Sequence, residues 1–287
     1  MKTIITSDSS CDLSKEQLEA FEIKTIPIYV TMNGEEYKDG INVTPQNIFD
    51  YVKQTKKLPK TAALSVADFS TFFKQILSKN KGANIVHISL SSGLSSCYEH
   101  ANMAALEFDG KVTVVDGKNL STGTGLLVLF AAKLAKDGVE YLDIVKRVQA
   151  RVPHVQASFI IPEVDYLYKG GRCSALSLLG ANLLKIKPKI QVINGKMKNV
   201  GKPRGKMSVV LKSYVDDTLK EFNNPDKTIC FITHSCLDEE TVKEITDYVK
   251  SKNIFDEVVN TVASSTITCH CGKGTLGILY INDGGEK

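Results

Sequence analysis

Short β-branched runs alternate with longer helical patterns through the first half of this chain. Residues 84–90 form a strongly apolar run, residues 97–108 repeat small and apolar side chains at helical spacing, and residues 112–115 are again β-branched. A strand followed by a helix and another strand indicates parallel pairing, because parallel neighbours need a long crossover connection. We therefore expect an α/β fold with a parallel sheet, whose ligands gather at the carboxyl ends of the strands.

Capping residues and periodicity place further elements in this half. Residues 3–6 and 26–31 have the composition of strands, and residues 14–21 that of a helix capped by Ser14. Residues 122–136 are apolar almost all round. We expect them to form a buried helix at the junction of two domains.

The second half mixes hairpins with helices, which indicates an α+β unit. Asn194-Gly195 forms a tight turn between strands expected over residues 186–193 and 197–200. The length agrees with two units, because 287 residues exceed the size at which one hydrophobic core usually stops growing. We expect an N-terminal α/β domain over residues 1–153 and a C-terminal domain over residues 154–287.

Charge and hydropathy restrict the partners and the location. The formal charge of +4 is small and its lysines are mixed with acids, so we expect no nucleic acid and at most an anionic membrane surface. No run approaches the roughly 20 apolar residues of a bilayer span, and the first residues lack the apolar core of a secretory signal. Scattered cysteines, odd in number, fit reduced thiols. We expect a cytoplasmic protein, with peripheral contact at the inner membrane surface as a second location.

The densest chemical signal is the serine-rich segment 90–96, which includes Ser91 and Ser92. It lies between an apolar strand and an amphipathic helix, where hydroxyls and free backbone N–H groups stabilise an anion. A carboxylate or a phosphate would suit this place. The alternative is that the serines only cap the helix and line a turn.

Thr61 and His270 are weaker signals for the same chemistry. Thr61 offers a hydroxyl at a sheet edge, although threonine is common there for its β-propensity. His270 lies against a glycine-rich turn that contains Gly272 and Gly274, and these glycines permit close approach of the backbone to a ligand. A lone histidine, however, is more often structural.

Metal, nucleotide and hydrolase sites are poorly supported. Cys269, His270 and Cys271 are adjacent and cannot easily converge on one tetrahedral ion, and the glycine segments miss the nucleotide-binding motifs. We expect no metal and no cofactor. A serine hydrolase is the enzymatic alternative, with Ser92 or Ser95 as nucleophile and His270 as base. The segment lacks the second glycine of the nucleophile elbow.

Two arginines lie in settings that suit an oxyanion or an acidic partner, because guanidinium presents a planar fork of donors. Arg172 follows a glycine pair, and Arg204 belongs to the compact basic loop 201–206. The alternative is that Arg172 holds local structure and that the basic loop is merely solvated.

Seven segments, in order along nearly the whole chain, together resemble the DegV family, whose members include the fatty-acid-binding subunit of bacterial fatty acid kinase. They are Thr6-Ser7-Asp8-Ser9-Ser10-Cys11-Asp12-Leu13, Ser91-Ser92-Gly93-Leu94-Ser95, Val115-Asp116 with Gly123 and Gly125, Lys169-Gly170-Gly171-Arg172, Lys187-Pro188, Lys202-Pro203-Arg204-Gly205, and residues 270–277.

The resemblance implies a lipid held between an N-terminal α/β domain and a C-terminal α/β domain with a largely antiparallel sheet. It implies that Thr61, Ser92 or Ser91, and His270 hold the carboxylate of a long-chain fatty acid. Arg204 would act toward a partner kinase subunit or the acyl phosphate, and Arg172 matches a family position of unassigned role. The chain would then be a carrier in phospholipid synthesis without turnover of its own. A further alternative is a pure interaction or regulatory protein, which the absence of lipid from the purified chain would favour.

The sequence departs from the family pattern at two places near these residues. The usual proline after Thr61 is lost, and Lys273 replaces the proline of the usual segment after His270. The threonine and the histidine themselves are retained.

Overall fold

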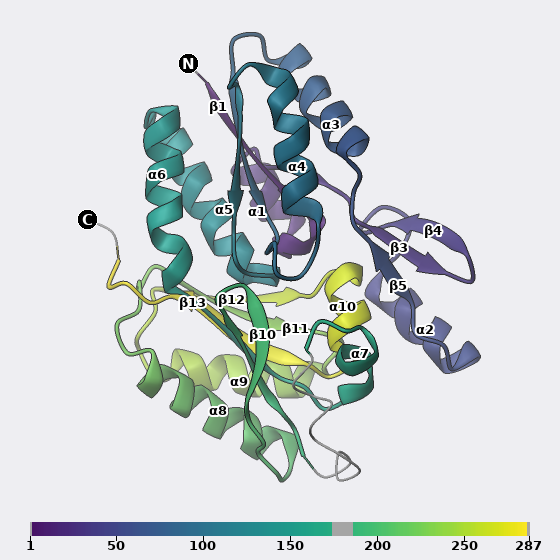
Figure 1. The fold of residues 1–287 in the computed structure, drawn as a ribbon. Helices are drawn as coiled ribbons and strands as arrows, with labels where there is room; N and C mark the ends of the chain where they lie inside the picture. The colour runs from purple at the N-terminus through teal and green to yellow at the C-terminus, as the bar shows by residue number, and fades with distance from the viewer. Residues whose placement is uncertain (1, 174–185, 286–287) are drawn as a thin grey trace.

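The computed structural model describes residues 2–173 and 186–285, and it has the α/β architecture that the sequence predicts. An N-terminal half is stacked on a C-terminal half, and a small third sheet projects at one side (Figure 1). The domain boundary expected after residue 153 falls inside a short 3-10 helix, η3 (Val152–His154), and stays a prediction. No helix among the described residues is long and apolar enough to cross a bilayer.

Four parallel strands form the sheet of the N-terminal half. In sheet order they are β2 (Lys24–Ile26), β1 (Thr3–Asp8), β6 (Asn84–Ser89) and β7 (Val112–Asp116). Their parallel pairing confirms the reading of the alternating pattern. The helices of this half are α1 (Lys15–Ala20), α3 (Val66–Lys79), α4 (Cys97–Ala105), α5 (Ser121–Lys136) and α6 (Tyr141–Arg151), with 3-10 helices η1 (Ser9–Cys11) and η2 (Leu106–Phe108).

One strand expected from the sequence is in fact two. The prediction of a single strand over residues 26–31 is wrong, because β2 ends at Ile26 and β3 (Tyr29–Met32) belongs to a different sheet. Pro27 lies between them and has no N–H for a ladder, so the chain leaves the parallel sheet there. The small sheet is antiparallel and contains β4 (Glu35–Lys38), β3 and β5 (Lys60–Ala62), with α2 (Pro45–Thr55) nearby.

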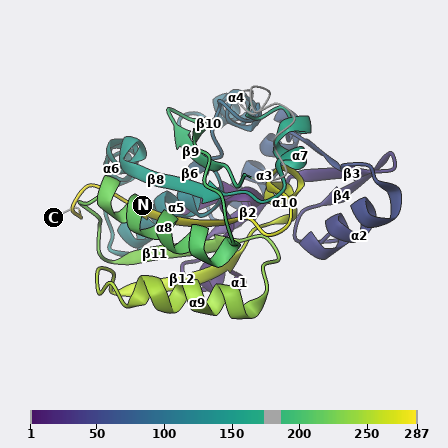
Figure 2. The ribbon, with the colours of Figure 1, turned by 90° about the horizontal axis from the view of Figure 1, so that it is seen from below.

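Six strands form the sheet of the C-terminal half. In sheet order they are β10 (Lys196–Gly201), β9 (Lys189–Ile193), β8 (Val155–Ile160), β13 (Leu276–Ile281), β11 (Ile229–His234) and β12 (Glu257–Val262). All neighbours are antiparallel except β11 and β12. Two helices, α8 (Met207–Glu221) and α9 (Glu239–Lys250), cover the outer face, and α7 (Val164–Lys169) and α10 (Ser265–Cys271) lie toward the small sheet (Figures 1 and 2).

Helix α5 lies between the two large sheets, as its apolar sequence predicts. It contacts β1 and β6 on one side and β8, β11 and β13 on the other. The largest apolar cluster therefore crosses the junction: it includes Ile85 and Ile88 of β6 together with Ala157, Phe231 and Leu279 of the C-terminal sheet. Because burial of this apolar surface is shared, the two halves stabilise each other.

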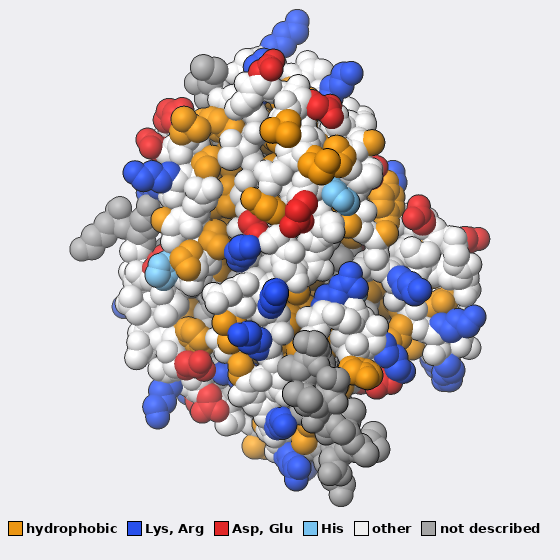
Figure 3. All heavy atoms as spheres, viewed as in Figure 1, with side chains coloured by type: hydrophobic (Ala, Val, Ile, Leu, Met, Phe, Trp, Pro, Cys, Tyr) orange, Lys and Arg blue, Asp and Glu red, His pale blue; other side chains and the backbone are white. Residues whose placement is uncertain are grey.

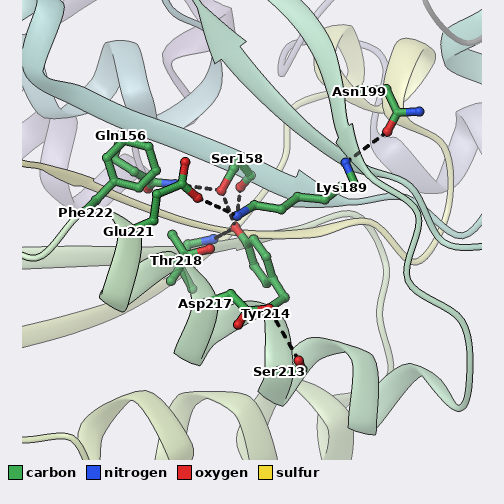
Figure 4. Close-up of polar contacts among 12 residues, drawn as sticks. Gln156, Ser158, Lys189, Asn199, Ser213, Tyr214, Asp217, Thr218, Glu221 and Phe222 are labelled. Carbon is green, nitrogen blue, oxygen red and sulfur yellow. Dashed lines mark hydrogen bonds and ion pairs between the residues drawn. The ribbon is translucent and has the colours of Figure 1, made fainter.

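A tyrosine of α8 is inserted into the ladder of the C-terminal sheet. The Tyr214 hydroxyl donates to the Ser158 carbonyl at 2.6 Å and accepts from the Ile278 N–H at 3.0 Å, although Ser158 and Ile278 are paired residues of β8 and β13. Figure 4 shows Tyr214 pointing from α8 toward Ser158. A Cβ on the neighbouring Gly277 would come within 2.5 Å of the same Ser158 carbonyl, so only glycine fits the opposite face at this point.

A buried ion-pair cluster also joins the two halves. Arg151 at the end of α6 contacts Asp226 at 2.6 Å and Asp283 at 2.7 Å, and its side chain is only 6% exposed. Its guanidinium also lies over the Phe130 ring of α5, 4.6 Å from the centroid. Both aspartates belong to loops of the C-terminal half, so this arginine connects segments that are far apart in the sequence.

Candidate functional site

A cavity of about 380 Å³ lies where the two halves meet. Apolar side chains make up most of its wall, among them Leu90, Leu94, Leu120, Phe159, Met197 and Leu279. Its volume falls in the range of roughly 300–1,000 Å³ that is usual for small-molecule sites. The space behind the predicted polar residues is therefore open.

The floor of the cavity is the inner face of the C-terminal sheet. Alternate residues of two paired strands face it, Ala157 and Phe159 on β8 and Gly277 and Leu279 on β13. Side chains two positions apart lie on the same face of a strand. Ile160, Ile278 and Tyr280, which occupy the alternate positions on these strands, pack instead under α8 and α9, so the sheet separates the cavity from the outer core.

The loop after β6 supplies the serine-rich wall. Ser92 lines the cavity; its backbone N–H donates to Asp116 Oδ1 at 3.2 Å and its hydroxyl accepts from Lys118 Nζ at 2.9 Å. Ser91 lies behind it, fully buried, and its hydroxyl donates to the Gly195 carbonyl at 2.7 Å. The two adjacent serines thus differ: one faces the cavity, and the other joins the loop to the β9–β10 hairpin.

Close backbone packing explains the glycine inside this loop. A Cβ on Gly93 would lie 2.6 Å from the Gly195 carbonyl, well inside contact distance. The loop and the hairpin turn therefore approach through backbone atoms, and a larger residue at position 93 would push them apart.

Thr61 and His270 both line the cavity and are hydrogen-bonded to each other, although 209 positions separate them in sequence. The Thr61 Oγ1 atom, on edge strand β5, lies 2.8 Å from His270 Nε2. His270 occupies the last turn of α10, and the glycine-rich turn expected beside it begins at Gly272. Ser-Thr-Ile-Thr-Cys-His-Cys is a poor helix-forming sequence, so local propensity does not indicate this helix.

Tertiary contacts hold the start of α10. The carboxylate of Asp39, next to β4, accepts from the backbone N–H groups of Ser265 and Thr266, and Asp12 accepts from Ser264 N–H at 2.9 Å. Both aspartates are buried, and burial raises the pKa of Asp12 to about 7. Carboxylates at a helix N-terminus satisfy its free donors, so residues of the N-terminal half fix the helix that carries His270.

The His270 ring is neutral at neutral pH. Its burial, with the nearby Arg172 charge, lowers the pKa of His270 to about 4. The Nδ1 atom is buried and has no hydrogen-bond partner among the described residues. Leaving a buried acceptor unpaired costs less free energy than leaving a buried N–H unpaired. The unpaired Nδ1 is therefore the acceptor, and the proton of the neutral ring lies on Nε2. Thr61 then accepts from His270 and keeps its own proton for a ligand.

Arg172 lies in the same part of the cavity, whereas Arg204 does not. Arg172 lines the cavity and donates to the carbonyls of Gly170, at 2.8 Å, and Leu94, at 3.4 Å. Gly170 packs closely against the histidine, because a Cβ at this position would lie 2.7 Å from His270 Nδ1. Arg172 is therefore connected to His270 through Gly170 and to the serine-rich loop through Leu94. Arg204 is exposed in the loop between β10 and α8 and is not among the cavity-lining residues.

The contacts of the serines bear on the hydrolase alternative. The Ser95 hydroxyl donates to Cys97 Sγ at 3.2 Å, and Ser92 accepts from Lys118. Among the described residues, His270 Nε2 contacts Thr61, and no hydrogen bond joins it to either serine. No cluster of His, Cys, Asp and Glu in residues 2–173 and 186–285 has the arrangement of a metal site.

Two residues at this site were missed by the sequence reasoning. Asp116 appeared there only as part of a family segment, and Lys118 was not singled out. Their position at the carboxyl end of a parallel strand and directly after it is the signal that could have found them, because such strand ends meet at one edge of the sheet. The contribution of the C-terminal sheet to the cavity floor had no local signal.

A family model described as "Uncharacterised protein, DegV family" matches residues 2–283. A DegV domain-containing protein of Staphylococcus aureus strain COL is 31% identical over 289 residues, covering 98% of this chain and 99% of that protein. Another, from Clostridium perfringens, is 28% identical, with 98% of this chain and 99% of that protein covered. The similarity thus extends along the whole length of both partners.

Solved structures show the same fold. A DegV family protein from Thermus thermophilus, described as fatty acid binding, superposes with a TM-score of 0.89 at 25% identity, covering 99% of this chain and 100% of the other. DegV of Bacillus subtilis, described as a fatty acid binding protein, gives 0.85 at 25% identity, with 99% and 100% covered. A stearic acid-binding protein from Eubacterium ventriosum gives 0.85 at 25% identity, with 97% of each chain covered.

Proposed function

The chain belongs to the DegV family, and we propose that it binds one long-chain fatty acid in the cavity between its two halves. The observation that carries this proposal is the combination of a largely apolar cavity with hydroxyl, imidazole and guanidinium groups on its wall. Solved relatives described as fatty-acid-binding support it. The chain acts as a cytoplasmic carrier without turnover of its own.

Thr61, Ser92 and His270 form the carboxylate site, with Thr61 and Ser92 as donors to the acid and His270 as the residue that orients Thr61. Each hydroxyl accepts from a neighbour, Thr61 from His270 and Ser92 from Lys118, so each can donate its own proton to a carboxylate oxygen. Arg172 lies close enough to offset the charge of the acid. The engagement of the Ser91 hydroxyl with Gly195 supports Ser92 rather than Ser91 as the ligand residue.

The apolar wall supplies the affinity. Burying a tail of roughly 16 carbons at about 0.8 kcal/mol per methylene gives on the order of 12 kcal/mol before the costs of ordering are subtracted. Donors around the carboxylate then add orientation, and they avoid an unpaired buried charge that would cost several kcal/mol.

Replacing Ser92 or His270 by alanine should weaken retention of fatty acid about tenfold, because each change removes one hydrogen bond to the headgroup or the residue that orients it. Mass spectrometry of denatured, freshly purified protein measures the bound lipid. Ser78→Ala and His154→Ala, at exposed positions, are the matched controls. Unchanged lipid retention in both site variants would refute these assignments.

The finer part of the proposal is that a separate kinase subunit phosphorylates the presented carboxylate with ATP, at a transient encounter near the membrane surface. Arg204 is exposed outside the cavity, which suits contact with a partner rather than with the lipid. A planar guanidinium suits an acyl phosphate or an acidic partner surface.

Arg204→Ala should therefore reduce kinase-dependent acyl phosphate formation while leaving lipid affinity within about twofold, because the arginine lies away from the cavity. Measuring both quantities on one preparation separates the two effects. Lys220→Ala, another exposed cation, serves as the control. Equal losses in binding and phosphorylation would count against this role.

A further inference from the structure

Lys118 is bonded directly to a cavity-lining serine. Its ammonium lies 2.9 Å from Ser92 Oγ and 2.7 Å from Asp116 Oδ2, and its backbone N–H donates to Asp116 Oδ1 at 2.9 Å. The residue has a left-handed backbone, with φ of 46°. This conformation is uncommon for a residue with a side chain, so the surrounding loop must hold it in place.

We propose that Lys118 is a positioning residue that sets the direction of the Ser92 hydroxyl and offsets the charge of Asp116 beside the fatty-acid headgroup. An ammonium can only donate, and a serine hydroxyl has a single proton. Because Ser92 Oγ accepts from Lys118, the proton of Ser92 is left to be donated to the carboxylate in the cavity. The inference rests on the proposed function and assigns a role in it to a residue outside the cavity lining.

The charge of Asp116 makes the lysine necessary. The side chain of Asp116 is 10% exposed, and although burial works to raise its pKa, hydrogen bonds from Lys118 and Ser92 hold that pKa below its ordinary value. The carboxylate therefore stays ionised next to the residue that receives the ligand. Without Lys118, an uncompensated negative charge would face the negative headgroup.

A second cation near the junction of the two halves, Lys196, serves as a comparison. Figure 3 shows several Lys and Arg side chains across the middle of the molecular face. Lys196 begins the neighbouring strand β10 and is exposed, and its stem lies near the same serine-rich loop. It has no hydrogen bond to a cavity residue in the described part of the chain, which makes it the matched control.

The test compares two ligands of equal tail length on the full chain after delipidation. Sodium palmitate carries the carboxylate, and 1-hexadecanol lacks the charge; displacement of a fluorescent fatty acid measures the affinity for each. Lys118→Met should weaken palmitate binding about tenfold, the value of one charge-assisted hydrogen bond, and hexadecanol binding by less than about twofold. Lys118→Arg should retain palmitate within about threefold, and Lys196→Met should bind both ligands as the wild type does.

A second variant separates charge from hydrogen bonding. Lys118→Met combined with Asp116→Asn removes both charges and should recover part of the palmitate affinity. The inference is overturned if Lys118→Met leaves palmitate binding unchanged, or if it weakens palmitate and hexadecanol equally, which would indicate a structural role. Failure of the wild type itself to bind palmitate would instead overturn the proposed function.

Discussion

Replacing Arg151 by methionine should lower the free energy of unfolding by about 3 to 5 kcal/mol, because it leaves two buried aspartates without their cation. The Asp226 and Asp283 side chains are 12% and 15% exposed, and both contact the guanidinium at less than 3 Å. Methionine retains much of the apolar stem that packs on Phe130, so the loss reports mainly on charge.

Denaturant unfolding measures this loss, with Lys146→Met on the exposed side of the same helix as control. The control should change stability by no more than about 0.5 kcal/mol. If the ion-pair cluster joins the halves into one cooperative unit, the variant should separate the unfolding of residues 1–153 from that of residues 154–287. An unfolding free energy within about 1 kcal/mol of the wild type would contradict the assigned role.

Replacing Ala157 by phenylalanine should reduce fatty-acid affinity about a hundredfold. Ala157 lies on the cavity floor, and its Cβ is already packed near α5 at Gly123, so the larger ring must enter the cavity. A ring that excludes about four methylenes of the tail removes on the order of 3 kcal/mol of burial, which corresponds to the predicted factor.

Lipid content by mass spectrometry and displacement of a fluorescent fatty acid both measure the effect. Ala150→Phe makes the same change at an exposed position of α6 and should retain the lipid. The thermal unfolding of Ala157→Phe must be measured alongside, because overpacking costs about 1 to 3 kcal/mol. A folded variant that still holds palmitate as tightly as the wild type would show that the tail lies elsewhere.

Local sequence patterns were sufficient to predict most of the helices and strands. Ser14 caps its helix through a capping box, and the apolar run at residues 84–90 gives a buried parallel strand. These features depend on neighbouring residues, whose propensities and spacing are visible in the sequence. Where tertiary partners decide, local patterns do not indicate the element: Asp12 and Asp39 hold the start of α10 by accepting from its first N–H groups.

The sequence by itself therefore determined the α/β class and the family, and it predicted the residues that we propose to hold the carboxylate. Only the tertiary structure decided that Thr61 and His270 touch, that Ser92 rather than Ser91 faces open space, and that Lys118 contacts Ser92. The physical reason is that a cavity is space left between surfaces contributed by distant segments. The periodicity of one segment gives no information about the space that the opposite surface leaves unfilled.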